Sequence, residues 1–307
     1  MKGLGALIKR NTKLYFKDKG MFFSSLITPV ILLILYGTFL KKIYEDSFRS
    51  ALEAAGAVIS DSVINGCVGG QLVSSLLAVS CVTVAFCSNL LMIKDKTTGA
   101  KHDLTMAPIN AGTLALGYYL STLFSTLIVS FCAAAVCLCY IAFVGWYFSF
   151  ADVMLFLLDV FLLTMFGTAL SSCFNFPLST QGQASAVGTI VSAGYGFICG
   201  AYMPISNFSQ SLQNILSFLP GTYGTSLLRS HAMKGTFAEM ERVGFPDEVV
   251  SAIRKSTDCS IEFFGHAVKT NMMYIILCGS TILLIGIYVI MNIVSNKKLS
   301  GAGGKKA

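Results

Sequence analysis

The segment KDKTTGAKHDLTMAPIN, residues 94–110, is a short charged stretch between two of the longest uncharged runs in the chain. Residues 62–93 contain no charged side chain, and neither do residues 104–151. A helix needs about 20 apolar residues to cross a bilayer, so both runs are long enough to do so. We therefore expect the 94–110 segment to lie in water at the ends of two membrane-buried helices, where another protein could push on the bundle.

The overall composition places the chain among membrane proteins. Only 12% of its 307 residues are charged and 54% are hydrophobic, with a mean hydropathy of +0.71. Soluble domains are typically about 25% charged. Several membrane spans fit into this length but a large soluble domain does not fit beside them, so a nucleotide-driven motor would have to be another chain.

The chain is predicted to be an all-α polytopic membrane protein that begins with an amphipathic helix. Residues 2–19 place apolar side chains on one arc and Lys9, Arg10, Lys13 and other basic side chains opposite, which is typical of a helix lying in the plane of the membrane surface. Six predicted spans follow, at about residues 22–40, 64–93, 111–143, 153–174, 184–203 and 271–295.

The segment between the last two spans, residues 204–270, is predicted to contain helices that do not cross the bilayer. A helix capped at Ser206 would have a single apolar face, which favours an interfacial or re-entrant position. Pro246 is expected to open a further short helix that runs through Lys255, after Gly244 ends another. This outer segment would join the fifth and sixth spans.

Two features inside the spans are candidates for function. Asp159 is an ionisable residue in the fourth span, where such residues are functional candidates by default. The alternative is that it reaches the interface or is protonated, because it follows Asp152 by only two helical turns. The fifth span has small residues at every fourth position, which allow close helix packing. That stripe could pack within the bundle or line a transport path; it comprises Ala184, Gly188, Ser192, Gly196 and Gly200.

The distribution of charge predicts which side each connection faces. Lys and Arg are more frequent in residues 2–19, the 94–110 segment and the C-terminal tail than in the other connections, whereas Asp and Glu show the opposite preference. Positively charged short loops stay on the cytoplasmic side. We therefore expect a multi-pass protein of the plasma membrane of a bacterial cell, with both termini and the 94–110 segment in the cytoplasm.

The sequence contains no pattern that nominates a catalytic, metal or nucleotide site. The tail GAGGKKA lacks the spacing and the Ser or Thr of a phosphate-binding loop. His102, His231 and His266 are far apart in polar segments and form no catalytic grouping. Most cysteines lie in apolar runs, without disulfide or zinc spacing. We expect no catalytic residue, metal or cofactor in this chain, and no nucleic-acid partner.

The order of these elements resembles a known family. The chain combines an in-plane basic helix with six spans, and its first cytoplasmic connection, residues 94–110, contains Asp95-Lys96, Gly99, Asp103-Leu104 and Pro108. The stretch YMPISNFSQSLQNILSFLPGTYGTSLLR, residues 202–229, provides a second match. Together these features are similar to the permease subunits of type-2 ABC exporters, whose fold is shared with the sterol- and drug-exporting G subfamily. An Arg or Glu-rich pair is usual where this chain has Asp95-Lys96, and residues 230–268 form a longer extension than in many drug- and polysaccharide-exporting members.

The resemblance implies a mechanism and partners. The 94–110 segment would contain a coupling helix that docks on a separate ABC ATPase, which would carry the ATP and Mg²⁺. Two permease copies, as a homo- or heterodimer, would complete the unit among membrane lipids. The coupling residues implied by the resemblance are Asp95, Lys96, Gly99, Lys101, Asp103, Leu104 and Pro108.

The resemblance also implies export between the two bundles, along the second and fifth spans. The residues expected along this path or at the dimer interface are Ser74, Ser75, Thr83, Gly188, Ser192, Gly196 and Gly200. The low charge of these spans favours an amphipathic or apolar substrate, such as a drug, an antibiotic, a peptide or a lipid-like molecule. The longer extension leaves the substrate class open, including that of a polysaccharide-exporting permease.

Three alternatives remain at the level of sequence. The 94–110 segment could be an ordinary positively charged cytoplasmic loop without a coupling role. The chain could be a secondary transporter or a channel, for which Asp159 would be the one candidate ion-coupling group. It could also be a peptide-immunity or sensing protein of the same architecture that transports nothing.

Overall fold

The computed structural model of the chain describes residues 3–54, 60–107 and 109–303. It is almost entirely helical, which confirms the predicted all-α fold. One small hairpin of β1 and β2 interrupts the helices. The elements are α1 (Leu4–Lys17), α2 (Lys19–Leu35), a π-helical segment (Tyr36–Leu40), α3 (Lys41–Ala54), α4 (Asp61–Ser88), α5 (Leu90–Thr97), α6 (Ala100–Met106), α7 (Ala111–Val144), α8 (Phe150–Asn175), α9 (Gln181–Ile198), a 3₁₀ turn (Ile205–Asn207), α10 (Gln210–Leu216), α11 (Pro220–Arg242), α12 (Asp247–Ser256), β1 (Glu262–Phe263), β2 (His266–Ala267) and α13 (Thr270–Gly303).

Five helical stretches in the described part of the chain are long and apolar enough to cross a membrane. They are Lys19–Asp46, Asp61–Thr97, Ala111–Val144, Phe150–Asn175 and Thr270–Asn296. These correspond to the first, second, third, fourth and sixth predicted spans. The fifth predicted span, 184–203, corresponds to α9, which ends at Ile198 and is not among the five. Polar and small residues such as Gln181, Gln183 and Ser185 dilute its hydropathy.

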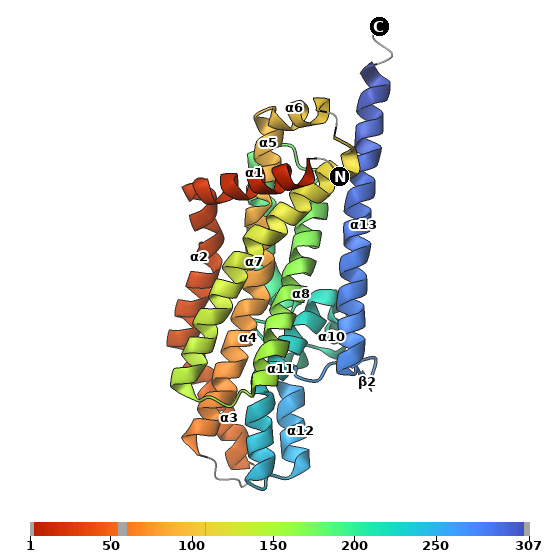
Figure 1. Cartoon of the computed structure of the whole chain (residues 1–307). Coiled ribbons are helices and arrows are strands. Elements are labelled where there is room, and N and C mark those ends of the chain that lie inside the picture. Colours follow the sequence, from red (N-terminus) through yellow and green to blue (C-terminus); the bar gives the residue numbers. More distant parts are fainter. Residues whose placement is uncertain (1–2, 55–59, 108, 304–307) are drawn as a thin grey trace.

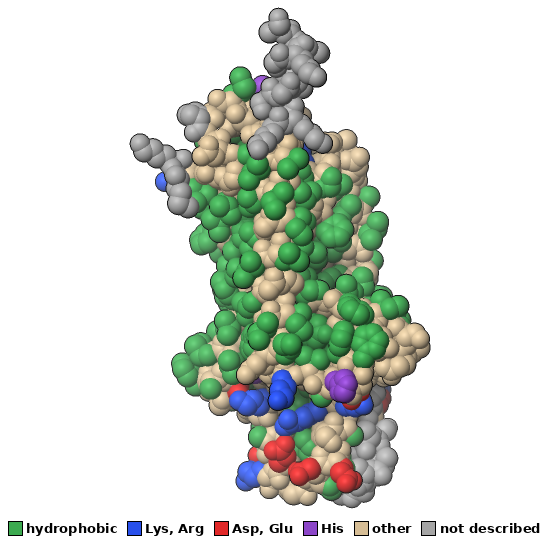
Figure 2. All heavy atoms as spheres, turned by 90° about the vertical axis from the view of Figure 1, so that its right-hand side faces the viewer, with side chains coloured by type: hydrophobic (Ala, Val, Ile, Leu, Met, Phe, Trp, Pro, Cys, Tyr) green, Lys and Arg blue, Asp and Glu red, His purple; other side chains and the backbone are tan. Residues whose placement is uncertain are grey.

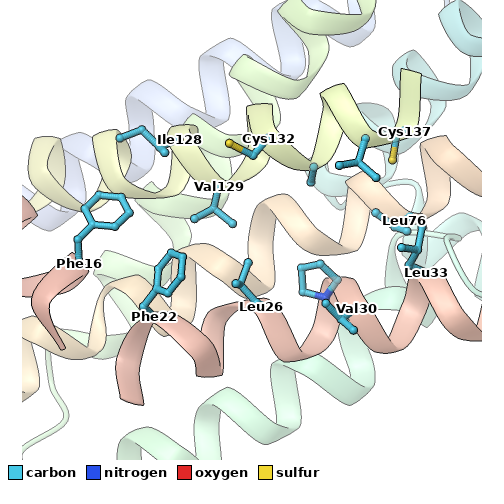
Figure 3. Close-up of a pocket in the computed structure, with 13 residues that line it drawn as sticks. Phe16, Phe22, Leu26, Val30, Leu33, Leu76, Ile128, Val129, Cys132 and Cys137 are labelled. Carbon is cyan, nitrogen blue, oxygen red and sulfur yellow. The ribbon is translucent and has the colours of Figure 1, made fainter. Parts of the chain in front are cut away.

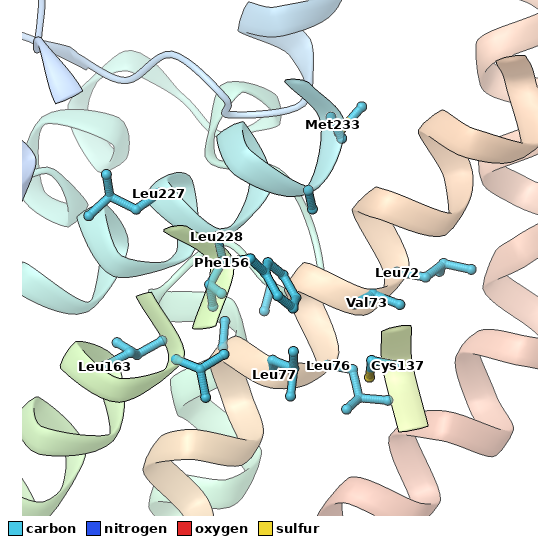
Figure 4. Packing of buried hydrophobic residues seen from close by; sticks show 14 of the residues in the cluster. Leu72, Val73, Leu76, Leu77, Cys137, Phe156, Leu163, Leu227, Leu228 and Met233 are labelled. Carbon is cyan, nitrogen blue, oxygen red and sulfur yellow. The ribbon is translucent and has the colours of Figure 1, made fainter. Parts of the chain in front are cut away.

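The helix α4 forms the centre of the bundle. In the most apolar 18-residue stretch of the span that α4 begins, 89% of the residues are buried. The corresponding stretches of the spans that contain α2 and α13 are each 22% buried. It contacts α2, α7, α8, α9 and α11. Figure 4 shows leucines of α4 packed among side chains of α8 and α11. Gly70 permits this packing, because a Cβ there would lie 2.8 Å from Met233 Cγ and 3.0 Å from the Ala232 carbonyl oxygen.

The basic helix α1 lies across one end of the bundle, roughly perpendicular to the long helices (Figure 1). It buries Leu7 and Tyr15 and exposes Lys9 and Lys13. This is the arrangement expected of an amphipathic helix in the plane of the membrane surface. The α5–α6 pair and the last turns of α13 lie at the same end, whereas α3 and α12 lie at the opposite end (Figure 1).

The surface agrees with a membrane location. Figure 2 shows a broad apolar area over the long helices on one face, with charged side chains gathered beyond its lower edge. Large apolar side chains are exposed on several helices, for example Phe23 and Ile27 of α2 and Ile282 and Leu283 of α13. A soluble monomer seldom exposes a continuous apolar surface of this extent. The chain is therefore a multi-pass membrane protein.

Two local predictions for the outer connections were wrong. The first span was predicted to end at about residue 40, but α3 continues it through the π-helical segment for about four further turns. The helix expected from Ser206 begins only at Gln210, because a 3₁₀ turn comes first and Ser209 occupies the N-cap position. The short helix after Pro246 agrees with the prediction, since α12 begins at Asp247.

Helix α11 is the element of the outer segment that differs most from the prediction. Pro220 occupies its first turn, where a missing N–H costs nothing, and the helix then runs to Arg242. It packs against α4, α8 and α13 and buries most of its residues. The predicted outer extension, residues 230–268, begins inside this helix. However, α11 is part of the core, because its polar side chains find partners on α4, α8 and α13.

Candidate functional site

The 94–110 segment forms two short helices at the end of the bundle. The first, α5, continues from α4 after a break at Asn89. The second, α6, begins directly after Gly99, whose φ of +81° lies in the left-handed region that glycine adopts without strain. Gly99 thus turns the chain from α5 into α6, and α6 projects beyond α1 (Figure 1).

Asp95 is buried and holds three helices together. It is 4% exposed. Arg10 Nη1 and Nη2 donate to its two oxygens at 2.7 and 3.1 Å, and the Tyr118 hydroxyl donates at 2.7 Å. These contacts join α5 to α1 and α7, and the carboxylate raises the pKa of Arg10. Asp95 therefore fixes the base of the segment within this chain rather than presenting a charge to a partner.

Lys96 and Lys101 fix the segment to the end of α8. Lys96 Nζ donates to the carbonyl oxygens of Phe176 and, at 2.8 Å, of Leu178. Both ammonium groups also lie over the Phe176 ring, at 5.3 and 5.2 Å from its centroid. Such cation–π contacts contribute about 0.5–2 kcal/mol each. Burial lowers the pKa of Lys101, which is consistent with a position against the bundle.

A third attachment joins the segment to the connection between α1 and α2. Lys94 Nζ lies 2.6 Å from Asp18 Oδ2, and Asp18 also caps α2 by accepting a hydrogen bond from the Met21 N–H. The hydrogen bond from Lys94 lowers the pKa of Asp18 below its usual value. The base of the segment is therefore attached to α1, α2, α7 and α8.

The tip of the segment is free of such contacts. His102 and Asp103 are exposed, and Met106 is 77% exposed. Leu104 is half-buried and packs against the apolar cluster that contains Leu7. Pro108 lies outside the described residues. Of the seven residues predicted for coupling, Asp103 is the one whose charged group faces away from the bundle.

The predicted path residues of α4 lie inside the single chain. Ser74, Ser75 and Thr83 are each at most 1% exposed. Ser74 and Thr83 donate hydrogen bonds to carbonyls of their own helix, and Ser75 accepts one from Arg229. In this conformation they line no surface that a substrate or a second copy could reach.

The small-residue stripe is only partly packed against its own bundle. Gly196 is buried against Tyr202, and Gly200, which follows α9, is buried against Ile205. Gly188 and Ser192 are half-buried, and a Cβ at Gly188 would meet no atom within 4 Å in the described part of the chain. The opposite side of α9 is the exposed one, where Ile190 is 70% exposed and Phe197, Ile198 and Thr189 also face outward.

Asp159 belongs to a buried polar cluster that sequence analysis did not find. Its carboxylate is 1% exposed, lies 2.6 Å from His231 Nδ1, and accepts a hydrogen bond of 2.7 Å from the Tyr274 hydroxyl. The cluster joins α8, α11 and α13. His231 follows Asp159 by 72 positions, and no sequence pattern relates residues that far apart in a helical bundle.

A second buried polar cluster surrounds Arg229 of α11. Its side chain is fully buried. It donates to Asp258 Oδ2 at 3.1 Å, to Ser75 Oγ at 3.0 Å and to the Gly200 carbonyl oxygen. The backbone N–H of Ile205 donates to the same carboxylate. The cluster joins α11 to α4, to the end of α9 and to the segment after α12.

The described residues contain no group of three or more His, Cys, Asp or Glu side chains that could hold a metal ion. Among the described residues, His231 is the one histidine that is paired with a carboxylate, at Asp159. The 94–110 segment combines a base held by the bundle with an exposed tip.

A comparison with family models identifies the chain's relatives. The model described as ABC-2 type transporter matches residues 2–232, well over half of the chain. The match includes α1, the 94–110 segment and most of the buried part of α11, and it confirms the resemblance seen in the sequence. A comparison with individual curated proteins gave no match. The chain belongs to the ABC-2 type transporter family, as a membrane permease component that operates with an ATPase subunit.

Proposed function

We propose that this chain is the permease subunit of an ATP-driven exporter and that a separate ATPase acts on it through α6. The observation that carries the proposal is the contrast within the 94–110 segment. Its base is held by Asp95, Lys94 and Lys96, whereas Asp103 and Met106 at its tip are exposed. A lever needs both a rigid attachment to the moving part and a free contact surface.

The contacts of α5 suggest how motion would pass inward. This helix touches α1, α4, α8 and α9 as well as α6. Closure of the ATPase, which would hold ATP and Mg²⁺, would push α6 toward the membrane. Because α5 continues α4 almost directly, the push would reach the centre of the bundle, and packed helices respond to such a push as rigid bodies.

We further propose that two copies form the working unit, with the termini and the 94–110 segment in the cytoplasm. The exposed apolar side of α9, which includes Ile190 and Phe197, is available for a second copy or for substrate. The second span would contribute Ser74, Ser75 and Thr83 only after α4 moves, since these residues are buried in this conformation.

An amphipathic or apolar substrate is supported by a cavity near the outer end. Its volume is about 910 Å³, within the range typical of small-molecule sites. Phe39, Leu35 and Phe197 supply apolar walls, and Gln71 and Asn207 add a few polar groups. Stimulation of ATP hydrolysis by highly charged solutes alone would contradict this substrate class.

The coupling proposal is tested by changing the tip. Asp103→Lys reverses an exposed charge and Met106→Asp places a charge on an exposed apolar side chain, so neither should disturb insertion. Both should abolish co-purification of the ATPase or the transport that it drives. Asp46→Lys is the matched control, because Asp46 is exposed at the opposite end of the bundle. Normal transport in both tip variants would remove the coupling role.

A substitution at Gly99, where the chain turns from α5 into α6, provides an independent test. Gly99→Pro cannot adopt the observed φ of +81°, because proline fixes φ near −65°. The permease should still insert, since Gly99 is at the surface, but α6 should point in a different direction and coupling should be lost. Unchanged ATPase drive in this variant would show that the orientation of α6 is irrelevant.

A second candidate function, secondary transport, is favoured by one observation, the cluster of Asp159, His231 and Tyr274. Buried ionisable groups are what an ion-coupled transporter requires. Vesicles that contain the chain without its ATPase separate the candidates. Substrate movement driven by a proton gradient alone, and lost in Asp159→Asn, would support secondary transport over the ATP-driven mechanism.

A further inference from the structure

A groove runs between α2 and α7 on the face of the bundle (Figure 3). Both helices pack on α4 and on α1, but in the described part of the chain they make few contacts with each other. The floor of the groove is Leu76 of α4, and its walls include Leu26 and Val30 of α2 and Val129 and Cys132 of α7. The cavity volume is about 360 Å³.

The groove has the dimensions and chemistry of a binding site for a hydrocarbon chain. Its lining is apolar along its full length. From Phe22 to Leu33 it follows α2 for about 16 Å, given a rise of about 1.5 Å per residue. This length is close to half of the hydrocarbon thickness of about 30 Å, which is the depth that one leaflet occupies. One acyl chain of a single leaflet therefore matches the groove.

The end of the groove at α1 continues into a second hollow, which is apolar inside and is bordered by two exposed lysines. Phe16 lines both cavities. The second hollow has a volume of about 430 Å³ and is lined by Lys9, Thr12, Lys13 and Phe124, among others. Because α1 lies across the bundle end (Figure 1) and lines this hollow, we expect the hollow to lie at the level of the lipid headgroups.

The polar groups of the second hollow lack partners of their own. Lys9 and Lys13 are exposed, and neither takes part in an ion pair within the described residues. Thr12 Oγ1 also has no hydrogen-bond partner in the same part of the chain, but it is buried and does not face the hollow. Two exposed cations one helical turn apart are suited to an oxyanion such as a phosphate.

We propose that the chain binds one anionic phospholipid of the leaflet in which α1 lies. An acyl chain occupies the groove between α2 and α7, and the phosphate lies beside Lys9 and Lys13. The proposal rests on the charge beside the hollow and the length of the groove, and it does not depend on which substrate the chain transports. Arg10, next to Lys9, attaches α1 to Asp95, so the lipid would bind beside the base of the 94–110 segment.

The test uses the purified full chain in phosphatidylcholine vesicles that contain a minority of phosphatidylglycerol with a photoreactive group in one acyl chain. Cross-linked peptides are identified by mass spectrometry. Labels should concentrate on the parts of α2 and α7 that line the groove. The same photoreactive group on phosphatidylcholine should label these positions roughly tenfold to thirtyfold less, since lysines near the headgroups attract anionic lipid.

Two pairs of variants test the two parts of the site. Lys9→Gln with Lys13→Gln should lower the phosphatidylglycerol label roughly tenfold to thirtyfold. Lys42→Gln with Lys269→Gln, a matched pair of exposed lysines outside the hollow, should leave it unchanged.

In the second pair, Ala133→Phe should fill the groove and remove the label of either lipid. Ala135→Phe changes an exposed residue of the same helix that does not line the groove, and it should have no effect.

The following results would overturn the proposal. Equal labelling by the two lipids would show that the hollow does not select anionic headgroups. An unchanged label in the Lys9 and Lys13 double variant would have the same meaning. Labels distributed evenly over all lipid-facing helices, or cross-links between two copies through Cys132, would show that the groove has a different occupant. Retention of far-UV circular dichroism in every variant ensures that a lost label reports binding rather than unfolding.

Discussion

Removal of Arg10 should destabilise the protein more than removal of its partner Asp95, although both changes break the same ion pair. The Asp95 side chain is 5% exposed, whereas that of Arg10 is 33% exposed. Arg10→Gln would leave a buried carboxylate with the Tyr118 hydroxyl as its one remaining donor among the hydrogen bonds described above. Asp95→Asn would leave a guanidinium that water already reaches.

The magnitudes follow from these exposures. Breaking a fully buried pair costs about 3–5 kcal/mol, and the partial exposure of Arg10 reduces this, so we expect about 2–3 kcal/mol for Arg10→Gln. Asp95→Asn should cost about 1 kcal/mol, because no unpaired charge is left buried. The double variant should be close to Asp95→Asn alone, since the uncompensated carboxylate is then absent.

The assay is reversible denaturant unfolding of the purified chain in mixed micelles, combined as a double-mutant cycle. Arg49→Gln is the control. Its pair with Asp61 is exposed at 54% and 76%, so that substitution should change the free energy of unfolding by less than about 0.5 kcal/mol. If Arg10→Gln costs no more than Asp95→Asn, or if the double variant equals the sum of the single ones, the explanation based on burial is wrong.

Three further outcomes test other parts of the fold. The free energy of unfolding should fall in acid as Asp18 is protonated. Because the folded state lowers the pKa of Asp18, the charged carboxylate stabilises the folded state at pH values above the ordinary carboxyl pKa of about 3.9. This stabilisation is lost as the pH falls through the lowered pKa of the folded state. Asp18→Asn or loss of its partner Lys94 should flatten that part of a stability–pH titration, and an unchanged acid limb would contradict the assignment. Gly70→Ala should cost about 1–3 kcal/mol in the unfolding assay, because its Cβ would meet atoms 2.8 and 3.0 Å away. The neighbouring Gly69→Ala, whose nearest contact is 3.9 Å, should cost much less, and equal costs would refute the packing argument. Arg229→Met should cost about 3–5 kcal/mol in the same assay, because it leaves a carboxylate buried without its cation; a loss below about 1 kcal/mol would mean that water reaches this cluster.

It was only partly predictable which side chains of the 94–110 segment face away from the bundle. Its position between two uncharged runs follows from the sequence, but the sequence gives no reason to separate Asp95 from Asp103. Helical periodicity places Arg10 on the polar face of α1 with the lysines, where it would face water. The structure turns Arg10 toward Asp95 because α1 crosses the ends of α5 and α7. A buried pair of this kind depends on the angle between helices, which local sequence does not encode.

The buried polar clusters were unpredictable for a related reason. His231 and Arg229 lie in a stretch that reads as the start of a polar outer extension. Both are buried because α11 packs among the membrane helices, so that Asp159 and Asp258 can accept their hydrogen bonds. Polar residues can be buried when every partner is supplied, and the partners come from helices distant in the chain.

The sequence by itself determined the class of protein, the approximate limits of most apolar helices, the basic amphipathic helix near the N-terminus and the position of the 94–110 segment between two apolar helices. These features depend on length, hydropathy and periodicity, which act within one helix at a time. Only the tertiary structure decided that α4 is central, that Asp95 faces inward while Asp103 faces out, and that a groove separates α2 from α7. These properties depend on which helix faces touch, and in a bundle whose helices are apolar on nearly all sides the hydrophobic pattern does not select the face.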